Sequence, residues 1–71
     1  MRIKRQDTPY GRFYFVLNDQ DHYLRMDGTF HAEYSFSLTN GTLGCKQKAR
    51  LYERLSSNGK LSFVLRALEI N

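Results

Sequence analysis

Residues 13–36 contain apolar segments separated by two polar turns, a pattern that predicts a three-stranded antiparallel meander. Aromatic and branched residues fill positions 13–17, and such side chains suit a pleated, half-buried surface. The polar run at residues 18–21 is typical of a turn. With a four-residue loop there, Leu17 pairs with His22 and Phe15 with Leu24. Directly paired residues share a face, so this register places the following apolar residues on one side: Phe13, Phe15, Leu17, Leu24 and Met26.

The second turn of the meander contains Asp27-Gly28, a strong hairpin signal. A two-residue turn would pair Met26 with Thr29 and separate Leu24 from Phe30. A three-residue loop at residues 26–28, with Gly28 left-handed, pairs Leu24 with Phe30 instead. Because a one-residue slip flips every side chain, we predict the three-residue loop, which gathers the apolar residues. The face of Phe15 and Leu24 then gains Phe30, Ala32, Tyr34 and Phe36, and the opposite face carries Tyr14, Val16, Tyr23, Arg25, Thr29, His31 and Glu33.

The segments on either side of the meander predict further strands. Residues 2–5 alternate weakly and carry charges that suit an edge strand. Residues 7–11 contain Pro9 and Gly11 and indicate a connector. Residues 61–70 are predicted to form a long strand with apolar side chains on both faces: Phe63, Leu65 and Ala67 on one, Val64, Leu68 and Ile70 on the other.

Residues 43–57 predict a helix, with Thr42 as its N-cap and Asn58-Gly59 as a left-handed stop. Helical periodicity places Cys45, Ala49, Tyr52 and Leu55 on a buried stripe, with Leu51 at its margin. It places Lys46, Arg50 and Arg54 on the solvent side. An all-β alternative joins residues 49–57 and 60–70 in a hairpin across Asn58-Gly59, but the separation of stripe and basic row favours the helix.

These elements predict an α+β fold in one domain, residues 1–71: a small antiparallel sheet with one helix packed on one face. A chain of 71 residues buries only a small core. We expect the most buried side chains to be Phe15, Leu24, Phe30, Phe36, Tyr52 and Leu55.

Residue types and spacing argue against several classes of function. One cysteine, Cys45, forms no internal disulfide and favours a reducing compartment, the cytoplasm. No apolar run approaches the roughly 20 residues that span a bilayer, so we expect no membrane contact. The spacing of His22, His31 and Cys45 matches no zinc pattern, and no motif predicts a cofactor. Cys45 near a helix start suits an activated thiol less well than a small core residue, so we expect a protein that is not an enzyme.

Charge is distributed unevenly along the chain, whose formal net charge is +4. The flanks are basic, and residues 13–41 are acidic. Two candidate surfaces follow. Aromatics beside an arginine can anchor a protein interface, which gives a partner-binding set on the outer face of the meander: Tyr14, Tyr23, Arg25 and His31. A cationic cluster can neutralise phosphates, which gives a second, nucleic-acid-binding set: Lys46, Arg50 and Arg54 with Arg2, Lys4 and Arg5.

The run at residues 23–30, followed by Phe36 and by Lys48-Ala49 in a helix, resembles small accessory proteins of phages and mobile elements, anti-CRISPR proteins among them. The resemblance covers residues 23–49 and transfers no functional residue. It implies an inhibitor or modulator that contacts a host protein or ribonucleoprotein complex in the host cytoplasm. Our first hypothesis is therefore a non-enzymatic protein-binding module, monomeric or homodimeric. The alternative is direct binding of RNA or DNA through the basic helix face. A third, minor hypothesis is a structural subunit or a homodimer that uses the strand predicted at residues 61–70.

Overall fold

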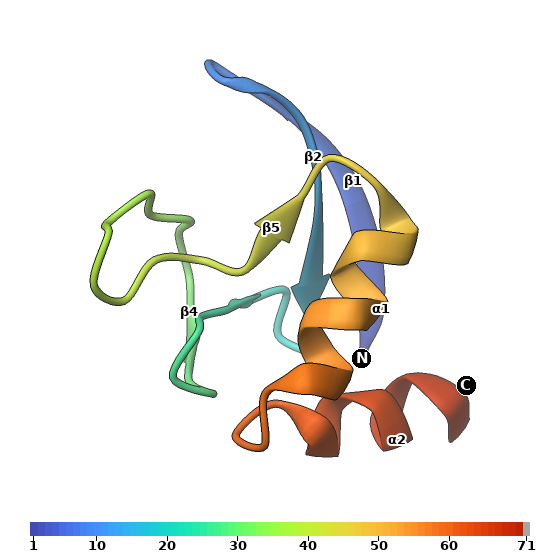
Figure 1. Cartoon of the computed structure of the whole chain (residues 1–71). Coiled ribbons are helices and arrows are strands. Elements are labelled where there is room, and N and C mark those ends of the chain that lie inside the picture. Colours follow the sequence, from blue (N-terminus) through green and yellow to red (C-terminus); the bar gives the residue numbers. More distant parts are fainter. Residues whose placement is uncertain (71) are drawn as a thin grey trace.

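The computed structural model describes residues 1–70 and contains a five-stranded antiparallel sheet followed by two helices, which confirms the α+β class. Figure 1 shows β1 and β2 as one long hairpin, with α1 beside the sheet and α2 below it. The elements are β1 (Arg2–Thr8), β2 (Gly11–Leu17), β3 (Tyr23–Leu24), β4 (Phe30–His31), β5 (Gly44–Cys45), α1 (Lys48–Ser57) and α2 (Ser62–Ile70).

The N-terminal edge strand is confirmed and is longer than predicted. β1 pairs with β2 from Arg2 opposite Leu17 to Thr8 opposite Gly11. The predicted connector thus forms the end of this hairpin, with Pro9-Tyr10 at its turn. The Thr8 hydroxyl accepts the Tyr10 N–H at 3.1 Å and donates to the Gly11 carbonyl at 2.8 Å. Gly11 has φ +119°, a conformation that glycine adopts without steric cost.

β2 is the central strand, because β1 pairs along one of its edges and both β3 and β5 pair along the other. Leu17 pairs with Tyr23 of β3, while Phe15 pairs with Gly44 of β5. A Cβ at Gly44 would lie 2.7 Å from the Phe15 ring, so this close approach requires glycine. Residues 44–45 are therefore a strand, and the predicted helix start at residue 43 is wrong. Gln47 is the N-cap of α1, whereas the Thr42 hydroxyl accepts the Ser35 N–H at 2.8 Å.

The predicted register of the first turn is wrong by one residue. Leu17 pairs with Tyr23 rather than His22, and Asp21 has φ 62°. The Asn18 side chain accepts the N–H groups of Gln20 and His22 at 2.9 and 3.0 Å and holds this longer loop. The slip exchanges the faces. Tyr14 and Val16 join Leu24 and Phe30 on the helix side, while Phe13, Phe15 and Leu17 lie on the side of Tyr23.

The three-residue second turn is confirmed, with Leu24 opposite Phe30. Gly28 has φ +90° and donates its N–H to the Arg25 carbonyl at 3.0 Å. The Asp27 carboxylate accepts the hydroxyl and the N–H of Thr29 at 2.6 and 3.0 Å. These hydrogen bonds lower the pKa of Asp27 below its usual value, because they stabilise the charged form.

Gly28→Ala is expected to lower the free energy of unfolding by roughly 1 kcal/mol or more, because alanine is strained at positive φ. Its Cβ would also lie 3.2 Å from the Lys60 carbonyl oxygen. Gly59→Ala is the matched control, since nothing lies within 4 Å of a Cβ there. Urea denaturation followed by circular dichroism measures both variants, and equal stability of the two would contradict the left-handed turn.

The main core lies between the sheet and the two helices. Its buried members are Val16, Leu24, Leu43, Cys45, Leu51, Leu55, Leu61 and Val64. Of the six residues predicted as most buried, three are fully buried: Phe15, Leu24 and Leu55. Phe30 is half-buried, and Phe36 and Tyr52 are 41% and 39% exposed. The predicted helix stripe is rotated, because Leu51 and Leu55 face the sheet while Ala49 and Tyr52 face solvent.

The predicted C-terminal strand is wrong, and so are the single helix and the all-β alternative. Leu61 and Val64 are buried, and Leu65 and Leu68 pack against the same core. This spacing is that of an amphipathic helix, and residues 65–69 are mostly good helix formers. α1 ends at the predicted Asn58-Gly59 stop, although Asn58 is extended, with φ −115°, rather than left-handed.

A second apolar layer covers the other face of the sheet. The predicted third strand ends at His31 instead of Phe36, and residues 32–41 are irregular. They bring Tyr34 onto the Phe15 ring, with ring centroids 5.8 Å apart, and Phe36 to 5.8 Å from Phe13. Tyr10, at the hairpin turn, contacts Phe36 edge-on at 5.0 Å. The aromatic residues therefore form a layer of their own rather than part of the helix-facing core.

Candidate functional site

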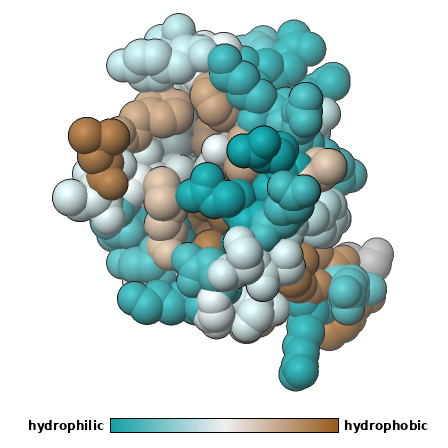
Figure 2. All heavy atoms as spheres, viewed as in Figure 1, coloured by the Kyte–Doolittle hydropathy of each residue, from teal (hydrophilic) through white to brown (hydrophobic). Residues whose placement is uncertain are grey.

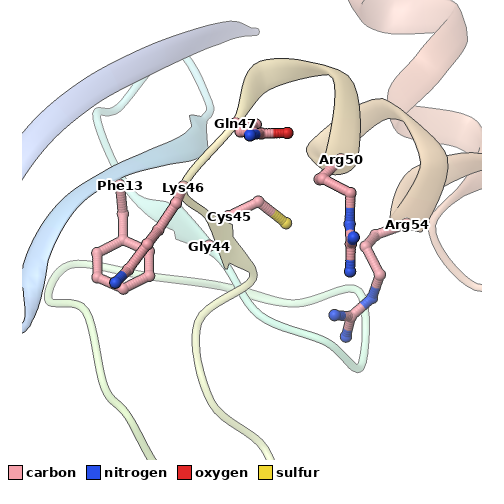
Figure 3. A pocket seen from close by; sticks show the side chains of 7 residues that line it. All are labelled: Phe13, Gly44, Cys45, Lys46, Gln47, Arg50 and Arg54. Carbon is pink, nitrogen blue, oxygen red and sulfur yellow. The ribbon is translucent and has the colours of Figure 1, made fainter.

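A hollow of about 330 Å³ lies where α1 begins, beside β2 and β5. We call it the basic hollow. Figure 3 shows Arg50 and Arg54 projecting side by side from α1, while Lys46 runs across the Phe13 ring. Its lining residues are Phe13, Gly44, Cys45, Lys46, Gln47, Arg50 and Arg54. The structure thus brings together the predicted row of Lys46, Arg50 and Arg54, which we call the basic trio.

The positive charge of the basic trio is weakly neutralised. Within residues 1–70, its one ion pair joins Arg50 Nε to Glu53 at 3.9 Å, on the exposed surface of α1. Arg54 contacts the Met26 sulfur at 3.9 Å. Lys46 Nζ lies 5.8 Å from the centroid of the Phe13 ring, within the range of a cation–π contact. Three cations therefore border one hollow and remain available to an anion.

Cys45 forms part of the wall of this hollow and belongs to the core. It is 9% exposed. Burial raises the pKa of the Cys45 thiol, an effect that the charges of Arg54 and Arg50 oppose. A raised pKa keeps the thiol protonated at neutral pH, and the thiol is a poor nucleophile. Within residues 1–70, no group of three or more histidine, cysteine or carboxylate side chains is placed to hold a metal ion.

A second hollow of about 260 Å³ adjoins the first, and we call it the aromatic hollow. Its lining residues are Tyr10, Phe13, Met26, Phe36, Ser37, Leu38, Gly41, Thr42 and Gly44. Phe13 and Gly44 line both hollows. Lys46 also reaches toward the β1–β2 turn, because its Cε lies 3.8 Å from the position of a Cβ on Gly11. The two hollows therefore form one continuous surface, basic on one side and aromatic on the other.

The partner-binding set predicted from sequence does not form one face. Tyr14 packs against the helix-side core. Tyr23 pairs with His31 and contacts Phe15 and Tyr34 on the other side of the sheet. The Tyr23 hydroxyl donates to Gln6 at 2.6 Å, and Arg25 Nε is buried. Tyr23 and His31 thus have hydrogen-bond partners within the fold, whereas Arg25 Nε has none among residues 1–70. Because Tyr14 lies on the opposite side of the sheet, the predicted cluster is wrong for Tyr14.

The N-terminal basic residues lie on β1 and do not join the basic trio. Arg2 and Lys4 are opposite Leu17 and Phe15, whereas Arg5 is opposite Tyr14 and so faces the other side. Arg2 also pairs with Asp21 at 2.6 Å.

Two aromatic residues of the candidate site were not predicted from the sequence. Tyr10 was placed within a connector, and Phe13 was assigned to the core. No local signal identifies Tyr10, because its position depends on the irregular segment that carries Phe36.

Hydrophilic side chains dominate one face of the molecule, and hydrophobic side chains are exposed at its edges (Figure 2). Figure 2 shows strongly hydrophilic atoms over the face that carries β5 and α1, and a hydrophobic patch over α2 at the lower right. Within residues 1–70 no helix has the length and apolar character needed to cross a bilayer.

No protein-family model, curated protein or solved structure matches this chain. The candidate site therefore rests on its own geometry.

Proposed function

We propose that this protein is a non-enzymatic binding module that contacts nucleic acid through the basic hollow. The observation that carries the proposal is the convergence of the basic trio on one hollow with a single, long ion pair to a carboxylate. Arginine and lysine are the side chains that neutralise phosphates and release their counterions. Arg50 and Arg54 add the planar donor geometry that suits phosphate oxygens.

Three acidic residues of the meander have local partners, and two of these partners are cations. Asp19 lies 3.4 Å from the terminal amino group, and Asp21 pairs with Arg2. The Asp27 carboxylate accepts hydrogen bonds from Thr29 and Asn40. None of these carboxylates lines the basic hollow. Glu53, the ion-pair partner of Arg50 at 3.9 Å, also lies outside the lining of the basic hollow, so phosphate oxygens compete with this one carboxylate for Arg50.

Mapping amide chemical shifts during titration with an oligothymidylate strand tests the proposed site. We expect the largest changes at residues 44–54 and at Phe13, because these residues line or support the basic hollow. Amides of α2 serve as the internal control, since its exposed residues lie outside the hollow. Changes spread evenly over the surface, or absent at residues 44–54, would contradict the proposal.

A second candidate function is contact with a host protein, as for a phage-type inhibitor or modulator. The observation that favours it is the exposed apolar surface of α2, where Phe63 is 46% and Ile70 84% exposed. Exposed apolar patches are typical of protein interaction sites. Retention of a host protein after nuclease treatment, with loss in the Phe63→Ser/Ile70→Ser variant, would support this function. Retention that depends on intact nucleic acid would contradict it.

A further inference from the structure

The aromatic hollow has the chemistry of a site for a nucleobase. Tyr10 is 68% exposed and Phe36 41% exposed, and their rings meet edge-on at 5.0 Å. Phe36 in turn lies 5.8 Å from Phe13 and 5.3 Å from Tyr34. The deeper rings thus hold Phe36 in place, while Tyr10 keeps most of its surface accessible. Aromatic faces of this kind stack with bases of any sequence.

The position of the aromatic hollow beside the basic hollow indicates which class of ligand fits this surface. Phe13 and Gly44 line both hollows, and Lys46 lies across the Phe13 ring (Figure 3). Arg54 contacts Met26, which lines the aromatic hollow. A ligand that spans both hollows carries negative charge next to a flat apolar ring. A nucleotide unit of a polynucleotide has this combination of groups.

We infer that the strand bound at this surface is single-stranded, with a base in the aromatic hollow and neighbouring phosphates on the basic trio. The inference rests on the proposed function and deepens it. Bases within a duplex are stacked and paired, and extracting one from the stack costs free energy. Unpaired bases are free to stack on aromatic side chains, as is common in the recognition of single strands. The site therefore prefers single-stranded to double-stranded nucleic acid and does not select a base sequence.

Fluorescence anisotropy with four labelled probes of equal length tests this inference: oligothymidylate, oligouridylate, an abasic strand and a DNA duplex. The first two compare DNA with RNA. We expect both intact strands to bind about five- to hundredfold more tightly than the abasic strand, the effect of stacking one base. We also expect the duplex to bind more weakly than either intact strand. Equal affinity for intact and abasic strands, or tighter binding of the duplex, would overturn the inference.

Substitutions of Tyr10 separate stacking from general apolar contact. Tyr10→Phe keeps the ring and should retain affinity, whereas Tyr10→Leu keeps apolar bulk and should lose about five- to thirtyfold for the intact strands only. The salt dependence should be unchanged in both variants, because the basic trio is intact. Thermal unfolding of both variants checks the fold. Wild-type affinity of Tyr10→Leu would overturn the stacking assignment.

The failure of this inference is distinguishable from failure of the proposed function. Salt-sensitive binding that is equal for intact and abasic strands overturns the base site and leaves the basic hollow as a phosphate site. Absence of binding to all four probes overturns both and favours a protein as the partner of this surface.

Discussion

Leu51→Ala is expected to lower the free energy of unfolding by about 2–5 kcal/mol, the usual effect of removing a fully buried leucine side chain. Leu51 is fully buried and packs with Leu55 and Val64 where α1 meets the sheet and α2. At about 0.05–0.15 kcal/mol per residue, a domain of this length has a total stability of roughly 4–11 kcal/mol. The substitution therefore removes a large share of the stability.

Leu38→Ala is the matched control for this change, because Leu38 is completely exposed. We expect it to change the free energy of unfolding by less than about 0.5 kcal/mol. Urea denaturation of both variants supplies the comparison. If Leu51→Ala and Leu38→Ala are equally stable, the face of α1 that packs on the sheet is assigned wrongly.

The two turns of the meander show how far local sequence determines this fold. Asp27-Gly28 specifies its turn because glycine readily supplies the positive φ that the loop requires, and the register there was predicted correctly. The loop at residues 18–22 contains no glycine. Its left-handed residue is Asp21, and the hydrogen bonds that the Asn18 side chain accepts hold the loop in this conformation. The polar composition predicted a turn but not its length. The loop is one residue longer than predicted, and this difference places the side chains of β2 on the opposite faces of the sheet from those predicted.

Pairings between distant segments were beyond local reasoning. β5 pairs with β2 because Gly44 fits against the Phe15 ring, an interaction between segments almost thirty positions apart in the sequence. Likewise, residues 61–70 satisfy both strand and helix patterns, and the leucines that cover the end of the core decide for the helix. The shared side of Arg50 and Arg54 was predictable from helical spacing, whereas the hollow that they border was not.

Reversing the charge of the basic trio, as Lys46→Glu/Arg50→Glu/Arg54→Glu, is expected to abolish measurable binding of single-stranded nucleic acid. Each side chain is exposed, so the fold should persist, and each new carboxylate repels phosphate. The matched control is Lys48→Glu/Lys60→Glu/Arg66→Glu, which changes net charge equally at exposed positions outside the basic hollow. We expect this control to retain most of the affinity, because general charge contributes less than direct phosphate contact.

The most direct test of the basic hollow is the salt dependence of affinity for oligothymidylate, compared between the wild type and the variant Lys46→Ala/Arg50→Ala/Arg54→Ala. Neutralising one phosphate of a single strand contributes about 0.7 log units of affinity per log unit of salt, so three cations account for a slope of roughly 2. We expect the wild type to exceed the variant by this amount. Equal slopes for the two proteins would contradict the assignment of the basic hollow as the phosphate site.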